Sequence, residues 1–199
     1  MSRTKINIVM LGQGSVGKSC LTVQLVSGTF IQTYNPTIEA DFQTTIECDG
    51  EMVHLTIFDT SGQEEYSAII DYHMRKGDGF IIVYSITNRS TYDHVEKIRN
   101  DIKRTFEEDD DPDKPMIVCG NKCDLEEDRQ VPCSEASEVF KNIGVPFIET
   151  SAKKNINVLE AYQMITRLIK QKQKEREELK RAANECGTIK EKKKLCCLL

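Results

Sequence analysis

A glycine-rich stretch near the N-terminus has the residue types and spacing of a phosphate-binding loop. Residues 12–19 read GQGSVGKS and match the pattern GxxxxGK[ST]. The glycines let successive backbone N–H groups point at one anion, Lys18 can reach the β and γ phosphates, and the Ser19 hydroxyl can bind Mg²⁺. A chance glycine turn could match these letters. The placement between the apolar run Ile6–Leu11 and a helical pattern over 17–27 favours phosphate binding.

A second motif, residues 59–63, reads DTSGQ and follows an apolar run that ends at Phe58. The Asp59 carboxylate can hold Mg²⁺ through water, and Gly62 can offer its backbone N–H to a γ-phosphate. The Gln63 amide can orient an attacking water. By itself the DxxG pattern is equally typical of a plain turn. Downstream of a phosphate-binding loop, it predicts a hydrolytic site.

Two further motifs predict which base is bound. Residues 121–124 read NKCD after the apolar run Met116–Cys119, and residues 151–153 read SAK after a strand at Ile148. The Asp124 carboxylate can only accept hydrogen bonds, and guanine presents two donors, N1–H and the N2 amine, at matching spacing. Adenine presents an acceptor and a C–H there, so a carboxylate facing adenine would stay unpaired. The sequence therefore favours guanine.

The elements that must position these motifs alternate between strands and helices. Continuous apolar runs followed by helical patterns indicate βα units around a buried parallel sheet, and an Asp-Gly turn between two alternating stretches indicates a hairpin. We predict an α/β fold of the P-loop NTPase type, with a six-stranded mostly parallel sheet, one antiparallel edge strand and helices on both faces. The expected strands cover about 6–11, 41–48, 52–58, 80–84, 116–119 and 146–148, and the expected helices about 17–27, 88–107, 134–143 and 156–180.

Composition and charge narrow the class of protein. The 199 residues suit one globular domain, and no apolar run approaches the roughly 20 residues of a membrane span. The net charge is −5, yet residues 170–194 carry ten Lys or Arg against five Asp or Glu, which leaves about −10 on the rest. An acidic body with a basic tail predicts no nucleic-acid binding. The eight cysteines contain no CxxC pair, which favours reduced thiols in a cytosolic compartment.

The C-terminal residues 192–199 read KKKLCCLL and form a CaaX box with leucine last. That ending favours geranylgeranylation of Cys196, and the Lys192–Lys194 cluster offers the second signal that one lipid chain needs for stable attachment. A frayed basic terminus with incidental thiols is the alternative. We expect a guanine-nucleotide-binding domain over 1–170 and, over 171–199, a helix extension followed by a flexible basic lipid-anchored tail without regular structure from about 183.

In this order, the motifs resemble those of the Ras superfamily, and more narrowly its Ras/Rap branch, over about residues 5–170. Residues 34–39, YNPTIE, resemble the first switch of that branch, and residues 79–85, GFIIVYS, resemble its fourth strand. The resemblance implies a small GTPase that cycles between a GTP-bound active state and a GDP-bound inactive state. It also implies signal transduction on the cytoplasmic face of a membrane, and we expect the plasma membrane.

The resemblance implies roles for single residues. Thr37 would supply a hydroxyl to Mg²⁺ and a backbone N–H to the γ-phosphate, and Phe30, which composition alone would place in the core, would stack on guanine. The Ala152 N–H would meet guanine O6. The implied catalytic residues are Lys18, Thr37, Gly62 and Gln63, and the implied Mg²⁺ ligands are Ser19, Thr37 and Asp59. The implied GTP- and GDP-binding residues are Gly14, Ser15, Val16, Gly17, Lys18, Ser19, Cys20, Phe30, Pro36, Thr37, Gly62, Asn121, Lys122, Asp124, Ser151, Ala152 and Lys153.

The resemblance further implies a monomer with three kinds of partner: an exchange factor, an activating protein and an effector that binds the switch loops. No arginine lies between Gly28 and Ala40, so we expect slow hydrolysis until the activating protein supplies one. Ala40 and Asn35 stand where the branch carries acidic residues, and Ser15 stands where it carries glycine. Two other functions remain open: a scaffold that holds GTP permanently, and a P-loop kinase or ATPase, which Asp124 disfavours.

Overall fold

The computed structural model describes residues 5–30, 40–60, 68–109 and 112–196, and side chains as far as Arg181. Its centre is a six-stranded sheet in the order β2-β3-β1-β4-β5-β6. Every neighbouring pair is parallel except β2 and β3, which run antiparallel and place β2 at one edge. The strands are β1 (Lys5–Leu11), β2 (Ala40–Cys48), β3 (Glu51–Asp59), β4 (Gly79–Ser85), β5 (Met116–Asn121) and β6 (Phe147–Thr150). The predicted sheet, including its antiparallel edge strand, is confirmed.

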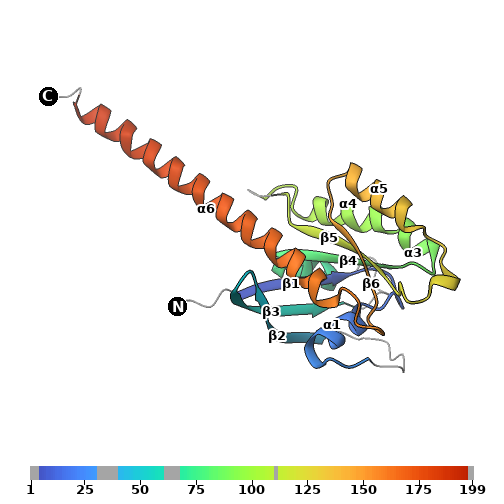
Figure 1. The fold of residues 1–199 in the computed structure, drawn as a ribbon. Coiled ribbons are helices and arrows are strands. Elements are labelled where there is room, and N and C mark those ends of the chain that lie inside the picture. Colours follow the sequence, from blue (N-terminus) through green and yellow to red (C-terminus); the bar gives the residue numbers. More distant parts are fainter. Residues whose placement is uncertain (1–4, 31–39, 61–67, 110–111, 197–199) are drawn as a thin grey trace.

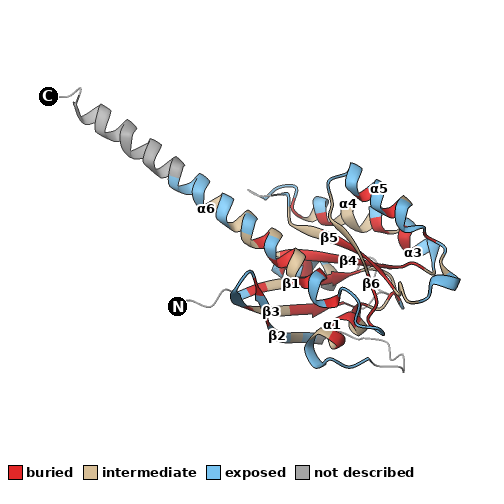
Figure 2. Cartoon of the chain, viewed as in Figure 1, coloured by how far each residue is buried: buried red, intermediate tan, exposed pale blue. Residues whose placement is uncertain are grey.

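Helices cover both faces of the sheet, as expected (Figure 1). One buried cluster joins the sheet to α1 and α6, and a second joins its other face to α2, α3, α4 and α5. The helices are α1 (Lys18–Ser27), α2 (Ala68–Lys76), α3 (Arg89–Asp93), α4 (Val95–Thr105), α5 (Cys133–Asn142) and α6 (Val158–Cys196), with a 3-10 turn η1 (Glu126–Asp128). Strand β4 is buried along its whole length, because both of its faces are covered. Figure 2 shows the same burial along the central strands.

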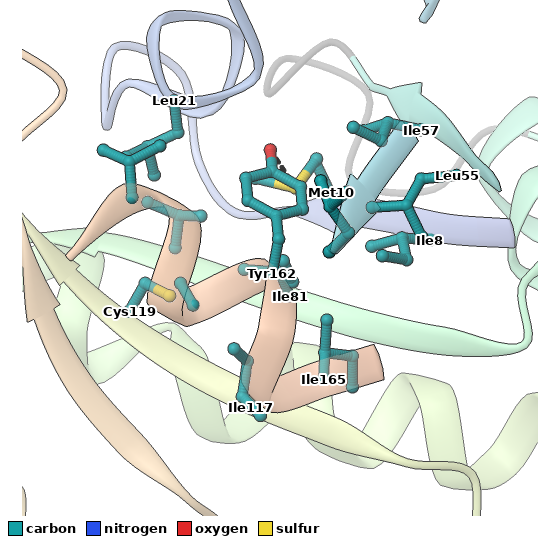
Figure 3. Packing of buried hydrophobic residues seen from close by; sticks show 14 of the residues in the cluster. Ile8, Met10, Leu21, Leu55, Ile57, Ile81, Ile117, Cys119, Tyr162 and Ile165 are labelled. Carbon is teal, nitrogen blue, oxygen red and sulfur yellow. Dashed lines mark hydrogen bonds between the residues drawn. The ribbon is translucent and has the colours of Figure 1, made fainter. Parts of the chain in front are cut away.

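A polar contact crosses the first of these clusters. Tyr162 of α6 is fully buried, and its hydroxyl donates to Met10 Sδ at 3.5 Å (Figure 3). The same hydroxyl lies 3.1 Å from the Thr22 hydroxyl of α1. A buried hydroxyl without a partner would cost free energy, so these contacts fix α6 against α1 and β1. The helix that carries the phosphate-binding loop is therefore packed against both the sheet and α6.

Two helices differ from the sequence prediction. Helix α2 was not predicted, because its pattern is short; the helix has Asp71 in its first turn and basic residues in its last. Helix α6 continues to Cys196, although no regular structure was expected from about 183. The extension, residues 183–196, contains no proline, and four of its residues are Lys and two are Glu, which are good helix formers. One i,i+4 ion pair, Arg181 with Glu177 at 3.8 Å, lies just before the extension.

The parallel strands place the predicted motifs together at the carboxyl ends of the strands. Asp59 at the end of β3 is in register with Met10 near the end of β1, and Asn121 at the end of β5 is in register with Thr150 at the end of β6. Ligands of open α/β sheets bind outside the carboxyl ends of the strands. The fold therefore gathers the described residues of all four motifs where a ligand is expected.

Candidate active site

The phosphate-binding loop connects β1 to α1 by a turn that only glycine can make at two positions. Gly12 has φ +142°, and a Cβ there would lie 2.2 Å from the Val83 carbonyl oxygen. Gly17 has φ +99°, and its Cβ would lie 2.3 Å from Asn121 Nδ2. Because Gly17 has no side chain to cap α1, the first N–H groups of that helix stay available to an anion. Val16 is buried and fixes the loop to the core.

Ser15 stands in the same loop with φ 63°, a left-handed conformation that costs most non-glycine residues about 1 to 2 kcal/mol. Its side chain is exposed, so no packing offsets the strain. We expect Ser15→Gly to raise the free energy of unfolding by about 0.5 to 1 kcal/mol, the strain released less the extra backbone entropy of glycine. Urea unfolding at fixed concentrations of GDP and Mg²⁺ measures this change in the free energy of unfolding. Asn155→Gly, at φ 53° in another loop, is the control and should gain less, because asparagine tolerates this conformation; an equal gain would contradict the argument.

Lys18 is folded over the loop it belongs to. The side chain is 5% exposed, and Nζ donates to the Gly12 carbonyl at 2.8 Å and to the Gln13 carbonyl at 3.0 Å. Burial lowers the pKa of Lys18 to about 8, and the charge of Asp59 partly opposes that change. A buried ammonium held by two carbonyl groups is well placed to move onto a phosphate, because an anion would compensate its desolvation.

The carboxylate of Asp59 is suited to a hard cation. It is 2% exposed, and its two oxygens lack a hydrogen-bond partner among the described residues. Burial raises the pKa of this carboxyl, and the neighbouring Ser19 hydroxyl and Lys18 charge oppose the rise. The next residue, Thr60, fixes the chain by donating its hydroxyl to the Met10 carbonyl at 2.7 Å. A buried carboxylate with a hydroxyl beside it is the oxygen donor set that Mg²⁺ prefers, so the residues fit this ion.

Asn121 joins the base-recognition loops to the phosphate-binding loop. It is 2% exposed, and Nδ2 donates to the Val16 carbonyl at 2.9 Å. Its Oδ1 accepts from the Thr150 hydroxyl at 3.3 Å and from the Ala152 N–H at 3.4 Å. Three segments far apart in the sequence are therefore fastened by one amide. The Ala152 N–H, expected to meet guanine O6, contacts Asn121 in this structure, so its contact with the base stays a prediction.

Asp124 is fixed by the other base-recognition loop. The Ser151 hydroxyl donates to Asp124 Oδ1 at 2.6 Å, and the Lys154 N–H donates to the Ser151 hydroxyl at 3.0 Å. Asp124 is only half-buried, which leaves lone pairs of its carboxylate for a ligand. The carboxylate is thus oriented before any base arrives.

Lys122 and Cys20 lie between the two ends of the site. Lys122 has φ 68°, and burial lowers the pKa of its ammonium while Cys20 and Asp124 raise it. Burial raises the pKa of the Cys20 thiol, and the negative charge of Asp59 raises it further, whereas the positive charge of Lys122 lowers it. Phe30 is 36% exposed and belongs to neither hydrophobic cluster, so its ring is open to a ligand.

Several predicted residues are not brought together by the described part of the chain. Pro36, Thr37, Gly62 and Gln63 lie outside the described residues, and the Cys196 side chain is also outside them. Lys153 is exposed, so its part in shaping the loop stays a prediction.

Sequence reasoning missed Thr60 and Thr150, whose hydroxyls anchor the site. Their position at the carboxyl ends of strands, with Thr60 inside one motif and Thr150 directly before another, is the signal that could have identified them.

A phosphate-binding loop, an oriented carboxylate for the base and a buried carboxylate for Mg²⁺ define a P-loop nucleotide-binding protein. A family model described as "Ras family" matches residues 7–171. "Ras-like protein 2" of Mucor circinelloides f. lusitanicus is 40% identical over 192 residues, covering 96% of this chain and 93% of the relative. "Ras-like protein rasB" of Dictyostelium discoideum is 43% identical over 168 residues, 84% of each chain.

The chain therefore belongs to the Ras family and is a Ras-like small GTPase. Membership of this family implies binding of GTP and GDP with Mg²⁺, and hydrolysis of GTP. It also implies exchange factors, activating proteins and effectors as general classes of partner. No helix in the described part of the chain is both long enough and apolar enough to cross a membrane.

Proposed function

We propose that the chain is a molecular switch that alternates between a GTP-bound active state and a GDP-bound inactive state in signalling at a membrane. One observation carries this proposal: the buried Asn121 amide ties the phosphate-binding loop to the loops that would read the base. Binding at the base end is thereby coupled to binding at the phosphate end, because one buried side chain contacts both. A protein so built can hold a whole nucleotide and respond to the loss of one phosphate.

At the phosphate end, the backbone N–H groups of residues 14–19 would surround the phosphates, and Lys18 would exchange its two carbonyl partners for phosphate oxygens. Ser19, Thr37 and Asp59 would hold Mg²⁺, which supplies positive charge beside the phosphates. Gln63 would orient the attacking water. At the base end, Asp124 would accept from guanine N1–H and N2, Phe30 would stack on the ring, and Asn121 and Lys122 would brace the pocket beside Asp124.

The switch would follow from the loss of one phosphate. With GTP bound, Thr37 and the Gly62 N–H are tied to the γ-phosphate, which holds the segments around 30–42 and 60–76 in the arrangement that an effector recognises. Hydrolysis removes both ties. The effector then dissociates, because it binds one arrangement better than the other.

Single-turnover conversion of bound GTP to GDP in Mg²⁺ tests this function directly. We expect Gln63→Leu to slow conversion on the order of 10²-fold, because the attacking water loses its orientation. The affinity for GTP should stay within a few-fold of the wild type, since the substitution does not touch the base end. Tight GTP retention without hydrolysis in the wild type would instead favour a scaffold of the same fold.

The partners would be an exchange factor, an effector bound to the switch segments, and an activating protein that supplies an arginine. The unassisted rate should be on the order of 10⁻⁴ to 10⁻³ s⁻¹, a magnitude that belongs to Ras itself and is carried over by analogy. Ala40 and Asn35 remove negative charge from the effector-binding segment, so the effector should present a less basic surface than is usual in the branch. Wild-type turnover that is fast without any partner would refute the need for an activator.

Attachment to the cytoplasmic face of the plasma membrane would rest on a geranylgeranyl group on Cys196 together with the basic residues of the tail. The lysines near the C-terminus would each contribute about 1 kcal/mol beside an anionic leaflet. Intact-mass analysis of the protein from eukaryotic cells should show the mass of one geranylgeranyl group and the loss of the last three residues, and Cys196→Ser should show neither. An unmodified wild-type mass would refute this anchor.

A further inference from the structure

A cavity of about 320 Å³ lies far from the nucleotide site, at the amino ends of β5 and β6. Its walls come from α4, the connection 112–115, the connection 143–146 and α6. In Figure 1 the chain leading into β5 runs close to α6, where α6 leaves the body of the protein. The nucleotide site of the Ras-family function argued above lies at the carboxyl ends of the strands, whereas this cavity lies at their amino ends. The cavity therefore has no part in nucleotide binding.

The cavity gathers positive charge on a body whose net charge is negative. Arg99 and Lys103 of α4, Lys114 of the connection and Lys172 of α6 line it. Two carboxylates, Asp113 and Glu175, line it as well, so the lining has two more cations than anions, or one more when Glu96, which pairs with Arg99 from outside the lining, is counted. Cations drawn from three elements onto one cavity repel one another unless an anion lies between them. The charge therefore favours an anionic ligand.

Arg99 has a donor left without an acceptor. Its side chain is 13% exposed, and Nη2 pairs with Glu96 Oε1 at 2.6 Å, yet the buried Nε–H has no partner among the described residues. Buried donors are nearly always paired, because an unpaired one loses its hydration without compensation. Because that nitrogen is also shielded from solvent, the unpaired donor lies in the wall of the cavity and not on its open surface. It adds to the positive potential of the wall, in the same sense as the lining charges.

The walls are held in place without a ligand. The Pro115 carbonyl accepts from the Phe80 N–H at 2.9 Å, and the Pro146 carbonyl accepts from the Val118 N–H at 2.9 Å, so both connections continue the sheet. The Lys114 ammonium lies 4.7 Å from the centre of the Phe106 ring, which limits where that charge can move. A cavity with fixed walls binds at a lower entropic cost than one that must form on binding.

The mixture of groups identifies the class of ligand. The cations suit phosphate oxygens, whereas the Asp113 and Glu175 carboxylates can accept hydrogen bonds from hydroxyl groups and the Gln171 amide can accept or donate them. The apolar side chains of Met116, Val145 and Leu168 offer surface for the face of a small saturated ring. Among the described residues, the lining contains no aromatic side chain that could stack on a base. We propose that the cavity binds a phosphorylated polyol, with inositol phosphate as the representative chemistry.

Such a ligand has two sources: a free inositol phosphate, or the headgroup of a phosphoinositide in the membrane to which the tail would attach. The test uses the full-length unprenylated protein saturated with GDP and Mg²⁺, so that the nucleotide site is occupied. The probes are inositol trisphosphate, measured by calorimetry, and phosphatidylcholine vesicles with or without phosphatidylinositol bisphosphate, measured by co-sedimentation. Binding to both probes assigns the membrane source, and binding to the soluble probe alone assigns the free source.

The variant Lys103→Gln/Lys172→Gln removes two cavity charges, and Lys174→Gln/Lys180→Gln removes two exposed charges of α6 outside the lining. We expect roughly a tenfold or larger loss of inositol trisphosphate affinity in the first variant, and a change within about twofold in the second. Unchanged GDP dissociation in both variants shows that they are folded. Equal losses in the two variants, or no binding of either probe to the wild type, would overturn the proposal.

Discussion

Replacing Asp124 with asparagine is expected to lower the affinity for GDP by about 10²- to 10⁴-fold. The carboxylate would accept two hydrogen bonds from guanine, and each hydrogen bond to a charged group contributes about 1.5 to 3 kcal/mol. Ser151 already holds Asp124 Oδ1 at 2.6 Å, so an asparagine should place its oxygen there and its amine toward the base. The amine would then face the N2 amine of guanine, donor against donor.

The same substitution should improve binding of xanthosine diphosphate, whose base carries an oxygen acceptor in place of the N2 amine. Competition against a fluorescent nucleotide gives both dissociation constants, and their ratio is insensitive to any general loss of stability. Asp128→Asn is the matched control, because this exposed aspartate in η1 loses the same charge four residues away. A guanine-to-xanthine ratio that Asp124→Asn leaves unchanged would mean that Asp124 does not read the base.

The sheet and most of its helices could be predicted because the signals are local. Continuous apolar runs marked the buried strands, and the Asp49-Gly50 pair marked the hairpin between β2 and β3. Both residues of that pair have positive φ, 54° and 79°, as the tight hairpin turn requires. The motifs that predicted the site were likewise short runs of sequence whose chemistry is fixed by residue type.

What could not be predicted depends on distant contacts or on weak local signals. The hydrogen bond from Asn121 to Val16 joins residues 105 positions apart, and only the strand order makes them neighbours. Helix α2 carries too short a pattern to be distinguished from a loop. The unpaired Nε–H of Arg99 exists only because tertiary packing buries it.

The largest structural effect is expected from Gly17→Ala. A Cβ at Gly17 would lie 2.3 Å from Asn121 Nδ2, so either the loop or the amide must move. Moving the amide breaks its hydrogen bond to the Val16 carbonyl and leaves buried polar groups unpaired. The φ of +99° adds backbone strain. We expect the free energy of unfolding to fall by about 2 to 4 kcal/mol, and the affinity for GDP to fall by roughly 10²-fold or more.

Gly28→Ala separates the clash from the strain, because Gly28 also has positive φ, +66°, but its Cβ would meet nothing within 4 Å. That control should cost only about 1 to 2 kcal/mol of stability and leave GDP affinity near the wild type. Urea unfolding and GDP dissociation rates measure both quantities. In an Asn121→Ala background the clash is gone, so Gly17→Ala should cost less there than in the wild type. Equal costs in the two backgrounds would show that Asn121 does not transmit the clash, and the coupling between the phosphate end and the base end would then have to run through another contact.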